Sequence, residues 1–328
     1  MAHEIDMSNG QANMAYVGET PWHGLGQQLQ AGASIEAWRK AAGMNFSIYT
    51  TPVAFKSDPD NVYAEDLFTG QNVLYRSDTR APLAVVSDKY QVVQPKEVLE
   101  FYRDLTEKAG FQLETAGVLK GGKKYWALAN MGKEVKLLDD TIKGYLLLGT
   151  ACDGSMATTA MFTSIRVVCN NTLGFAMTEA DSGKAKNVVR VNHRTAFEED
   201  KIKAQLGLAA TSWKQFLTSV NVWMKTKVDM DEAQNYFDNI ASYTTTDGET
   251  KVSERTSKYL MELFAGAGRG SDLKSANGTV WGLVNAVTEF VDHHRGRTSD
   301  VRIDRAWFGD GIATKEKATE LANELCVV

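Results

Sequence analysis

The hydrophobic pattern of this chain changes its period about halfway along, and that change limits what the chain can fold into. From about residue 45 to about residue 180, short β-rich segments such as "FSIYTTPVAF", "NVLYRS" and "APLAVVSDKYQVV" alternate with turn residues. From residue 197 onward, apolar residues recur every three to four positions, which is the period of a helix. The pattern predicts an α+β fold, with an antiparallel sheet of β-hairpins and packed helices followed by a mainly helical C-terminal part.

Local signals place individual elements within this division. "KGGK" at 120–123 and Asp153-Gly154 are expected to be the turns of two hairpins. Ser34 and Gly43 bracket one short helix, and Gln94-Pro95 opens another that ends at Gly110. We expect a single helical run of about thirty residues from residue 197. The chain is therefore divided into an N-terminal segment with a short helix (1–44), a strand-rich α+β core (45–182) and a mainly helical region (183–328).

The composition excludes several classes of protein. No stretch approaches the ~20 apolar residues of a membrane-spanning helix, so we expect no membrane partner. The N-terminal "MAHEIDMSNGQ" has no basic patch followed by an apolar run, so no signal peptide is expected. Three cysteines, none in a C-x-x-C pair, indicate free thiols in a reducing compartment. The five histidines are not spaced with them as zinc ligands, so neither a metal nor a cofactor is expected.

The stretch "SIRVVCNNTL" at 164–173 places polar side chains among apolar ones. Cys169 is either a nucleophile, which would need a base and an electropositive site, or a small packed residue. Asn170 is either part of a helix cap or a contact to a base edge or phosphate. The pattern favours a strand-to-helix junction in which Cys169 packs inward. Arg166 is the residue that packing explains least.

Two further patterns resemble a metal site and a phosphate-binding loop. His293 and His294 are adjacent, so they face different sides of a helix and are better explained as cations at a helix C-terminus than as a metal pair. "GAGRGS", within 265–271, lacks the Lys-Ser/Thr of a phosphate-binding loop and follows a helix, so a mobile loop is expected there.

The basic residues carry the strongest functional signal. Lys184, Lys186, Arg190 and Arg194 fall within eleven residues that contain no acid. Lys123 and Lys124 lie at a predicted hairpin turn, and Lys89 and Tyr90 follow a predicted strand. Cationic loops beside aromatic side chains can follow a phosphate backbone and stack on bases. The alternative is an ordinary solvated surface, which the formal net charge of −5 favours.

Several short motifs occur together and in order: "ETPWHGLGQQL", "VVSDKYQVVQPKEVLEF", "RVVCNNTL", "GTVWGLVNAVTEFVDHH" and a late "FGDG". As a set they resemble the phage/plasmid-like family of unknown function that is found on prophages, phages and conjugative plasmids. The resemblance covers nearly the whole chain and implies a protein of a mobile genetic element in the host bacterial cytoplasm. A weaker similarity is to phage single-strand annealing recombinases, which implies a strongly bent antiparallel sheet and assembly into rings or filaments.

These observations lead to one main functional expectation and two alternatives. The main one is a non-enzymatic protein that binds and anneals single-stranded DNA as a homo-oligomer, with no catalytic residue. The alternatives are a phage structural or host-interaction protein that binds no nucleic acid, and a thiol or metal enzyme. The residues expected to contact DNA are Arg166, Lys89, Tyr90, Lys123, Lys124, Arg190, Arg194 and Asn170.

Overall fold

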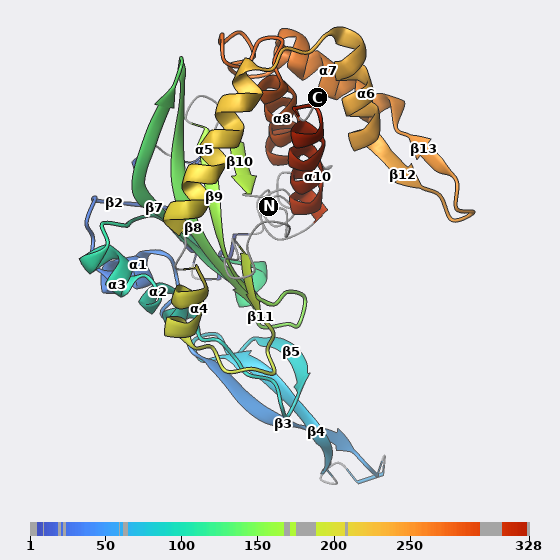
Figure 1. The fold of residues 1–328 in the computed structure, drawn as a ribbon. Coiled ribbons are helices and arrows are strands. Elements are labelled where there is room, and N and C mark those ends of the chain that lie inside the picture. Colours follow the sequence, from blue (N-terminus) through green and yellow to red (C-terminus); the bar gives the residue numbers. More distant parts are fainter. Residues whose placement is uncertain are drawn as a thin grey trace.

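The computed structural model describes residues 5–8, 10–18, 21, 24–58, 60–61, 65–166, 171–174, 188–206, 209–295 and 310–326. They form a mixed α+β fold, so the expected class is confirmed (Figure 1). Cys169, Asn170, Lys184 and Lys186 lie outside the described residues.

The centre of the molecule is a large sheet, which has eight strands within the described residues. All of its pairings are antiparallel except the parallel pairing of β1 with β2. β11 joins the sheet beside β9. The order across the sheet is β10 (Asn171–Gly174), β9 (Thr158–Arg166), β8 (Asp140–Ala151), β7 (Lys124–Leu137), β6 (Gln112–Leu119), β1 (Met14–Val17) and β2 (Gln27–Leu29), with β11 at Val188–Val191.

The two expected hairpins are present. β6 and β7 are joined by the 3₁₀ turn η1 (Lys120–Gly122), where Gly121 and Gly122 adopt positive φ angles that favour glycine. β8 and β9 are joined around Asp153-Gly154. A third hairpin, β7–β8, turns at Leu138 and Asp139 and was not expected. Strands from residues before 44 and after 182 also pair in this sheet, so all three expected segments contribute to it.

Each face of the sheet has its own cover. On one face, Ala127, Leu146 and Phe162 belong to the main core, and α5 crosses there with Trp213 against Gly144. On the other face, Trp126, Leu147 and Met161 form a smaller cluster with Ile5, Ala12 and Met14 of the N-terminal segment. Gly117 is required on this second face, because a Cβ there would lie 2.4 Å from the Trp126 ring. Helices therefore cover one face and the N-terminal segment covers the other.

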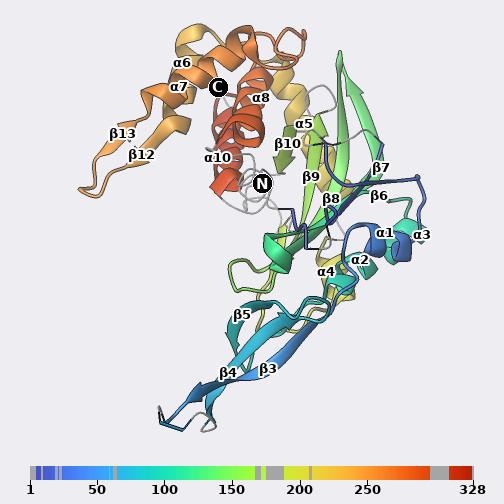
Figure 2. The same cartoon turned by 180° about the vertical axis from the view of Figure 1, so that it is seen from behind.

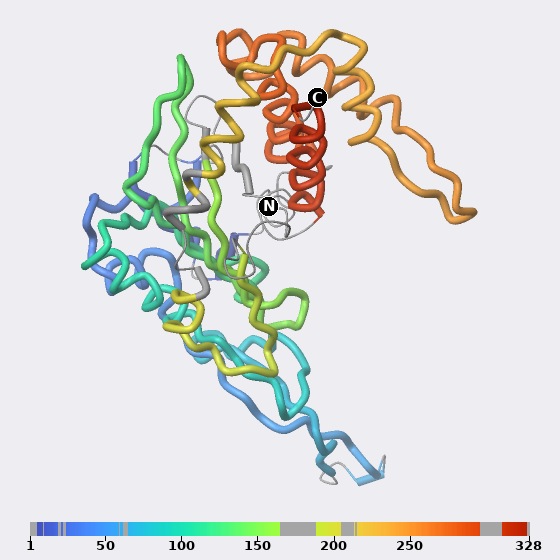
Figure 3. Tube along the Cα trace, viewed as in Figure 1, coloured from blue at the N-terminus to red at the C-terminus, as the bar shows by residue number. Residues whose placement is uncertain are grey.

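A three-stranded sheet projects from one end of the large sheet (Figures 1 and 2). It consists of β3 (Ile48–Lys56), β4 (Glu65–Arg76) and β5 (Pro82–Ser87), with a register shift between Pro52 and Val53. Beyond that shift only β3 and β4 continue. The tube in Figure 3 shows the chain running from the N-terminal helices straight out along this projection. We call β3 and β4 the arm.

One helix is shorter than the sequence pattern predicts, because the helix expected from Pro95 to Gly110 is two. In the run expected from residue 197, helices are described at 199–206 and 209–225, and residues 207–208 lie outside the described residues, so a single helix there stays a prediction. The described helices are α1 (Ile35–Ala41), α2 (Pro95–Glu100), α3 (Arg103–Lys108), α4 (Glu199–Leu206), α5 (Ala209–Lys225), α6 (Met230–Ala241), α7 (Glu254–Glu262), α8 (Val280–Glu289) and α10 (Asp310–Glu324). Another hairpin, β12 (Ser242–Thr244) with β13 (Thr250–Val252), projects between α6 and α7.

The stretch "SIRVVCNNTL" does not lead from a strand into a helix, so that prediction is wrong. Residues 171–174 form β10, which pairs antiparallel with β9 and sets Asn171 opposite Arg166. Cross-strand pairing on an existing sheet edge outweighs the capping tendency of the two asparagines, because the partner strand supplies the backbone hydrogen bonds that a cap would otherwise provide.

Candidate nucleic-acid interface

Four of the predicted basic residues gather at one end of the large sheet. We call Lys89, Lys123, Arg190 and Arg194 the cationic end. Lys123 precedes β7, and its carbonyl accepts the amide of Cys152 at the end of β8. Arg190 lies opposite Thr159 at the start of β9. Four different loops or strand ends therefore meet at this place.

Direct contacts tie Lys89 and Arg194 to the same region. Tyr90, next to Lys89, stacks on His193, next to Arg194, with ring centroids 4.6 Å apart and an interplanar angle of 13°. The Gln91 amide donates to the His193 carbonyl at 2.6 Å. The Tyr90 hydroxyl donates to the Ala151 carbonyl at 3.0 Å, which brings the end of β8 into the same cluster.

The four cations are not neutralised by carboxylates in the described part of the protein. None of them forms an ion pair within the part of the chain that the structure describes. Lys89, Arg190 and Arg194 are exposed, and Lys123 is half-buried. Two described acids, Asp88 and Asp153, lie in the adjoining turns. A cluster of unpaired cations of this kind is suited to hold an anion.

Tyr90 has a structural part in this cluster. Burial raises the pKa of its hydroxyl, and His193 covers one face of its ring. Both ring nitrogens of His193 contact backbone carbonyls, those of Gln91 and Met156. The Tyr90–His193 pair therefore fixes the loops that carry Lys89 and Arg194. Because His193 covers one face of the Tyr90 ring, less of that ring is available to stack on a base.

The remaining predicted residues do not join this end. Lys124 is only 7% exposed, so the prediction that it lines a surface groove is wrong. Arg166 is at the opposite end of β9, eight residues from Thr158, which corresponds to about 26 Å of extended strand. Asn170 lies outside the described residues, so its predicted contact stays a prediction.

Two basic residues near this end were missed by sequence reasoning. Arg80 and Lys120 adopt φ angles of 57° and 54°, a left-handed conformation that is uncommon for residues with a Cβ. Such outliers are worth a functional hypothesis because the surrounding structure must hold them in place. Arg76 links their two turns: its backbone amide donates to the Ala81 carbonyl at 3.1 Å, and its guanidinium donates to the Gly121 carbonyl at 3.2 Å.

Arg76 itself is the centre of a buried ion cluster behind the cationic end. It is 1% exposed, and it donates to Asp6 at 2.6 Å and to Asp78 at 2.7 Å. Its guanidinium also lies 4.0 Å above the Phe46 ring. Burial alone would raise the pKa of Asp6, but hydrogen bonds from Arg76, Ser8 and Asn13 and the charge of Arg76 hold it below its ordinary value. The cluster fastens the N-terminal segment to the base of the arm.

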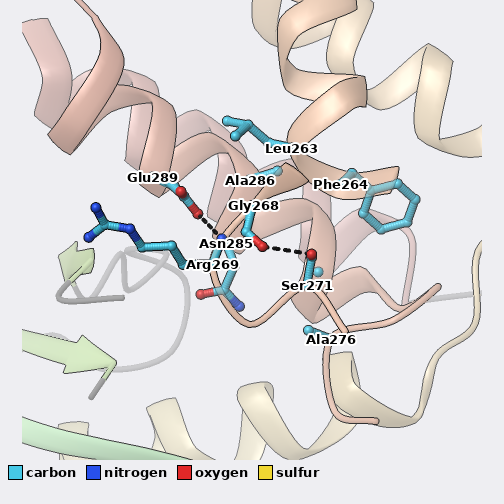
Figure 4. Close-up of a pocket in the computed structure, with 10 residues that line it drawn as sticks. Leu263, Phe264, Gly268, Arg269, Ser271, Ala276, Asn285, Ala286 and Glu289 are labelled. Carbon is cyan, nitrogen blue, oxygen red and sulfur yellow. Dashed lines mark hydrogen bonds between the residues drawn. The ribbon is translucent and has the colours of Figure 1, made fainter. Parts of the chain in front are cut away.

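A second candidate, a small pocket between α7 and α8, is drawn in Figure 4. The Glu289 carboxylate accepts the Arg269 amide at 2.9 Å, and the Ser271 hydroxyl donates to the Gly268 carbonyl at 2.7 Å. The Arg269 guanidinium extends away from the pocket. Asp139, from the β7–β8 turn, accepts the amides of Lys274 and Ser275. The loop containing "GAGRGS" is therefore held by hydrogen bonds at two places, more than the expected mobile loop would be.

The thiol alternative concerns Cys169, which lies outside the described residues, so it stays a prediction. Cys152 is buried, and burial raises its pKa to about 12, so it is a protonated thiol at neutral pH. No group of three or more His, Cys, Asp or Glu side chains in the described ranges is placed to hold a metal ion. None of the helices in those ranges is both long and apolar enough to span a membrane.

Comparison with known proteins gives a family and no activity. Over residues 82–308 the chain matches the family model described as "Domain of unknown function (DUF932)". Searches among curated proteins and among solved structures found no match. The matched region includes β5, the hairpins of the large sheet and α8, and within it lie Lys89, Lys123, Arg166, Arg190 and Arg194. Because this region makes up most of the sequence, the chain belongs to the DUF932 family of domains of unknown function.

Proposed function

We propose that this protein binds single-stranded DNA without catalysing a reaction, and that it anneals complementary strands as a homo-oligomer in recombination. A bacteriophage or another mobile genetic element would encode it, and it would act in the host bacterial cytoplasm. The main support is the cationic end, where four basic side chains from separate parts of the chain meet without a carboxylate partner among the described residues.

The physical reason is local charge rather than total charge. The net charge of −5 opposes long-range attraction to DNA, but the field of exposed cations reaches only about one Debye length, about 8 Å at physiological ionic strength. A phosphate backbone at the cationic end would therefore respond mainly to the four nearby cations. The half-exposed ring of Tyr49, at the start of β3, is an aromatic surface that could stack on a base.

The test is a fluorescence-anisotropy titration of a labelled single-stranded oligonucleotide at several salt concentrations. For single strands, the slope of log K against log salt changes by about 0.7 for each phosphate that is neutralised. Replacing Lys89, Lys123, Arg190 and Arg194 with Ala should therefore reduce the slope by up to about 3 and weaken binding at low salt. A second labelled strand, complementary to the first, tests annealing by energy transfer.

A matched control carries the same charge change elsewhere. Lys136, Lys225, Arg255 and Lys258 are exposed, lie on other elements and form no ion pair within the described part of the chain. Their replacement with Ala also lowers the net charge by four, from −5 to −9. The control should retain most of the binding and of the slope. Failure of the wild-type protein to bind at low salt, or equal losses in both variants, would refute the proposal.

The second candidate, a phage structural or host-interaction protein without nucleic-acid binding, is favoured by one observation. The arm exposes large apolar side chains, including Leu67, which is 63% exposed. An exposed apolar surface is a common mark of protein association. A pull-down with nuclease treatment distinguishes this candidate: it requires a stable complex with a host or phage protein, and it fails if the anisotropy titration shows tight binding of DNA.

A further inference from the structure

The arm is an exposed, largely two-stranded structure with apolar side chains on its surface. Tyr49, Phe55 and Phe68 of the arm are 51%, 49% and 54% exposed, and Val85 of the adjoining β5 is 62% exposed. A two-stranded hairpin in water is marginally stable unless a further surface covers it. About half or more of each side chain is exposed in the described part of this chain, so this surface is available to another molecule.

These four side chains share one face. Alternate residues along a strand point to the same side, so Tyr49, Val53 and Phe55 of β3 lie together. The register pairs Tyr49 with Tyr75 and Val53 with Phe68 across β3 and β4. Between them Thr51 pairs with Val73, which in turn pairs with Val85 of β5. The apolar face therefore runs the whole length of the arm, from Tyr49 at the base to Phe55 near the tip.

The tip of the arm and the neighbouring cationic end carry unlike charges. Asp58, Asp60, Glu65 and Asp66 lie at the tip with Lys56, and none of the four acids forms an ion pair within the described residues. The cationic end adjoins the arm without being part of it: the Gln94 side chain bonds both backbone groups of Ile48 at the base, and the Asp88 amide donates to the Gly70 carbonyl about halfway along β4. An unpaired acidic tip and unpaired cations beside the base and middle of the arm thus lie along the same projection.

The tip cannot reach the base of its own arm. β3 has nine residues, so its two ends lie about 26 Å apart, and the arm points away from the large sheet (Figures 1 and 2). The carboxylates at the tip therefore do not meet the cations at the base within one chain, whereas a second copy can bring the two groups together.

We propose that two copies of this protein pair through their arms in antiparallel orientation, the acidic tip of each on the cationic end of the other. A two-fold axis near Thr51 satisfies both charged contacts at once and stacks the two apolar faces in between. This interface rests on the homo-oligomer of the proposed function, and it specifies which surface of the chain forms it. It makes the cationic end a shared site, because the same cations would bind either the arm of the partner or a DNA strand.

The first experiment measures mass by size-exclusion chromatography with light scattering. The wild-type protein should be a dimer at low salt and shift toward monomer as salt rises. Asp58→Asn, Asp60→Asn, Glu65→Gln and Asp66→Asn together should yield a monomer with an unchanged melting temperature. The control variant carries Asp200→Asn, Asp231→Asn, Asp272→Asn and Glu254→Gln, which neutralise three exposed Asp and one exposed Glu elsewhere, and it should stay dimeric.

The second experiment tests orientation. Thr51 is exposed near the middle of β3, so Thr51→Cys should form a disulfide with the same residue of the partner under mild oxidation. The equivalent substitution at the base or the tip, Tyr49→Cys or Phe55→Cys, should cross-link much less, because antiparallel arms place those positions apart from their own copies. Equal cross-linking at all three positions would overturn the antiparallel arrangement.

The two proposals fail in different ways. A wild-type protein that is monomeric at every salt concentration, or a neutralised-tip variant that stays dimeric, overturns the arm pairing and leaves DNA binding intact. A dimer that depends on the acidic tip but binds no oligonucleotide overturns the proposed function and supports the pairing. In the neutralised-tip variant, oligonucleotide binding should be kept or strengthened, because the cationic end is then free.

Discussion

Replacing Arg76 with Met should strongly destabilise the protein, although Arg76 is not itself part of the proposed interface. The change removes the guanidinium that joins Asp6, Asp78 and the Gly121 carbonyl. The side chain of Asp6 is 3% exposed, and without Arg76 its carboxylate keeps only the hydrogen bonds from Ser8 and Asn13. Met fills much of the same space, so the loss comes mainly from a stranded buried charge.

Breaking a buried ion pair by removing one partner costs about 3–5 kcal/mol. Unfolding entropy of about 2.1 cal/mol/K per residue over 328 residues gives roughly 0.7 kcal/mol/K, so a loss of about 4 kcal/mol lowers the melting temperature by about 6 °C if the chain unfolds as one unit. Asp6→Ala should cost less, because Arg76 keeps Asp78 as a partner. The double variant should cost less than the sum of the two single variants, since it leaves no unpaired charge.

Thermal unfolding followed by circular dichroism gives the melting temperatures of the wild type, Arg76→Met, Asp6→Ala and the double variant. Arg80→Ala serves as a control for the neighbouring turn. The pH dependence gives a second check. The lowered pKa of Asp6 means that its contribution to stability is complete above the ordinary carboxylate value of 3.8 and is lost as pH falls through the lowered value. In Arg76→Met the stranded carboxyl should protonate at a higher pH, so the deficit of the variant should shrink in acid. A loss of unfolding free energy below about 1 kcal/mol in Arg76→Met would refute this reasoning. A double variant that loses the full sum of the two single losses would refute it as well.

Three further predictions concern the site, the core and the thiol. Arg166→Ala should weaken oligonucleotide binding in the anisotropy assay without lowering the melting temperature, and unchanged affinity would confine the DNA path to the cationic end. Gly282→Ala places a Cβ 2.1 Å from the backbone carbonyl oxygen of Ala276. Calorimetry should therefore show a loss of unfolding free energy of at least about 1–3 kcal/mol. An unchanged unfolding free energy would contradict the close approach of α8 to the loop that contains Ala276. Cys152 should resist iodoacetamide at pH 8 until the protein is unfolded, since its thiol is buried with a pKa of about 12; peptide mass spectrometry would contradict this if it found rapid labelling of the native protein.

Local signals predicted the elements whose boundaries are set by local physics. Ser34 accepts the amide of Ala37 as a helix cap, and the Gly121-Gly122 turn adopts the backbone conformation that glycine permits. The pairing of strands that lie far apart in the sequence could not be predicted from the hydrophobic pattern. β1, β2 and β10 are three or four residues long, and nothing within so short a segment identifies a partner that lies far along the chain.

The candidate site was predicted only in part for the same reason. Charge along the chain identified Lys89, Lys123, Arg190 and Arg194, but the sequence alone did not show that they share one end of the sheet. It also did not show that Lys124, the neighbour of Lys123, turns inward, because successive residues at the start of a strand point to opposite sides. The Arg76 cluster depends on a contact across 70 residues, which no local motif could reveal.

The pairing of β1 with β6 has a consequence for how the chain is made. Met14 meets Gly117, so the N-terminal strand has no sheet to join until more than a hundred further residues have been synthesised. At about 5–20 residues per second, that interval is on the order of 5–20 s. During it, Ile5, Ala12 and Met14 remain without the strands they cover in the finished protein. This segment is thus open to a chaperone during that interval, and folding of the large sheet should be slow because its closing contacts are distant in sequence.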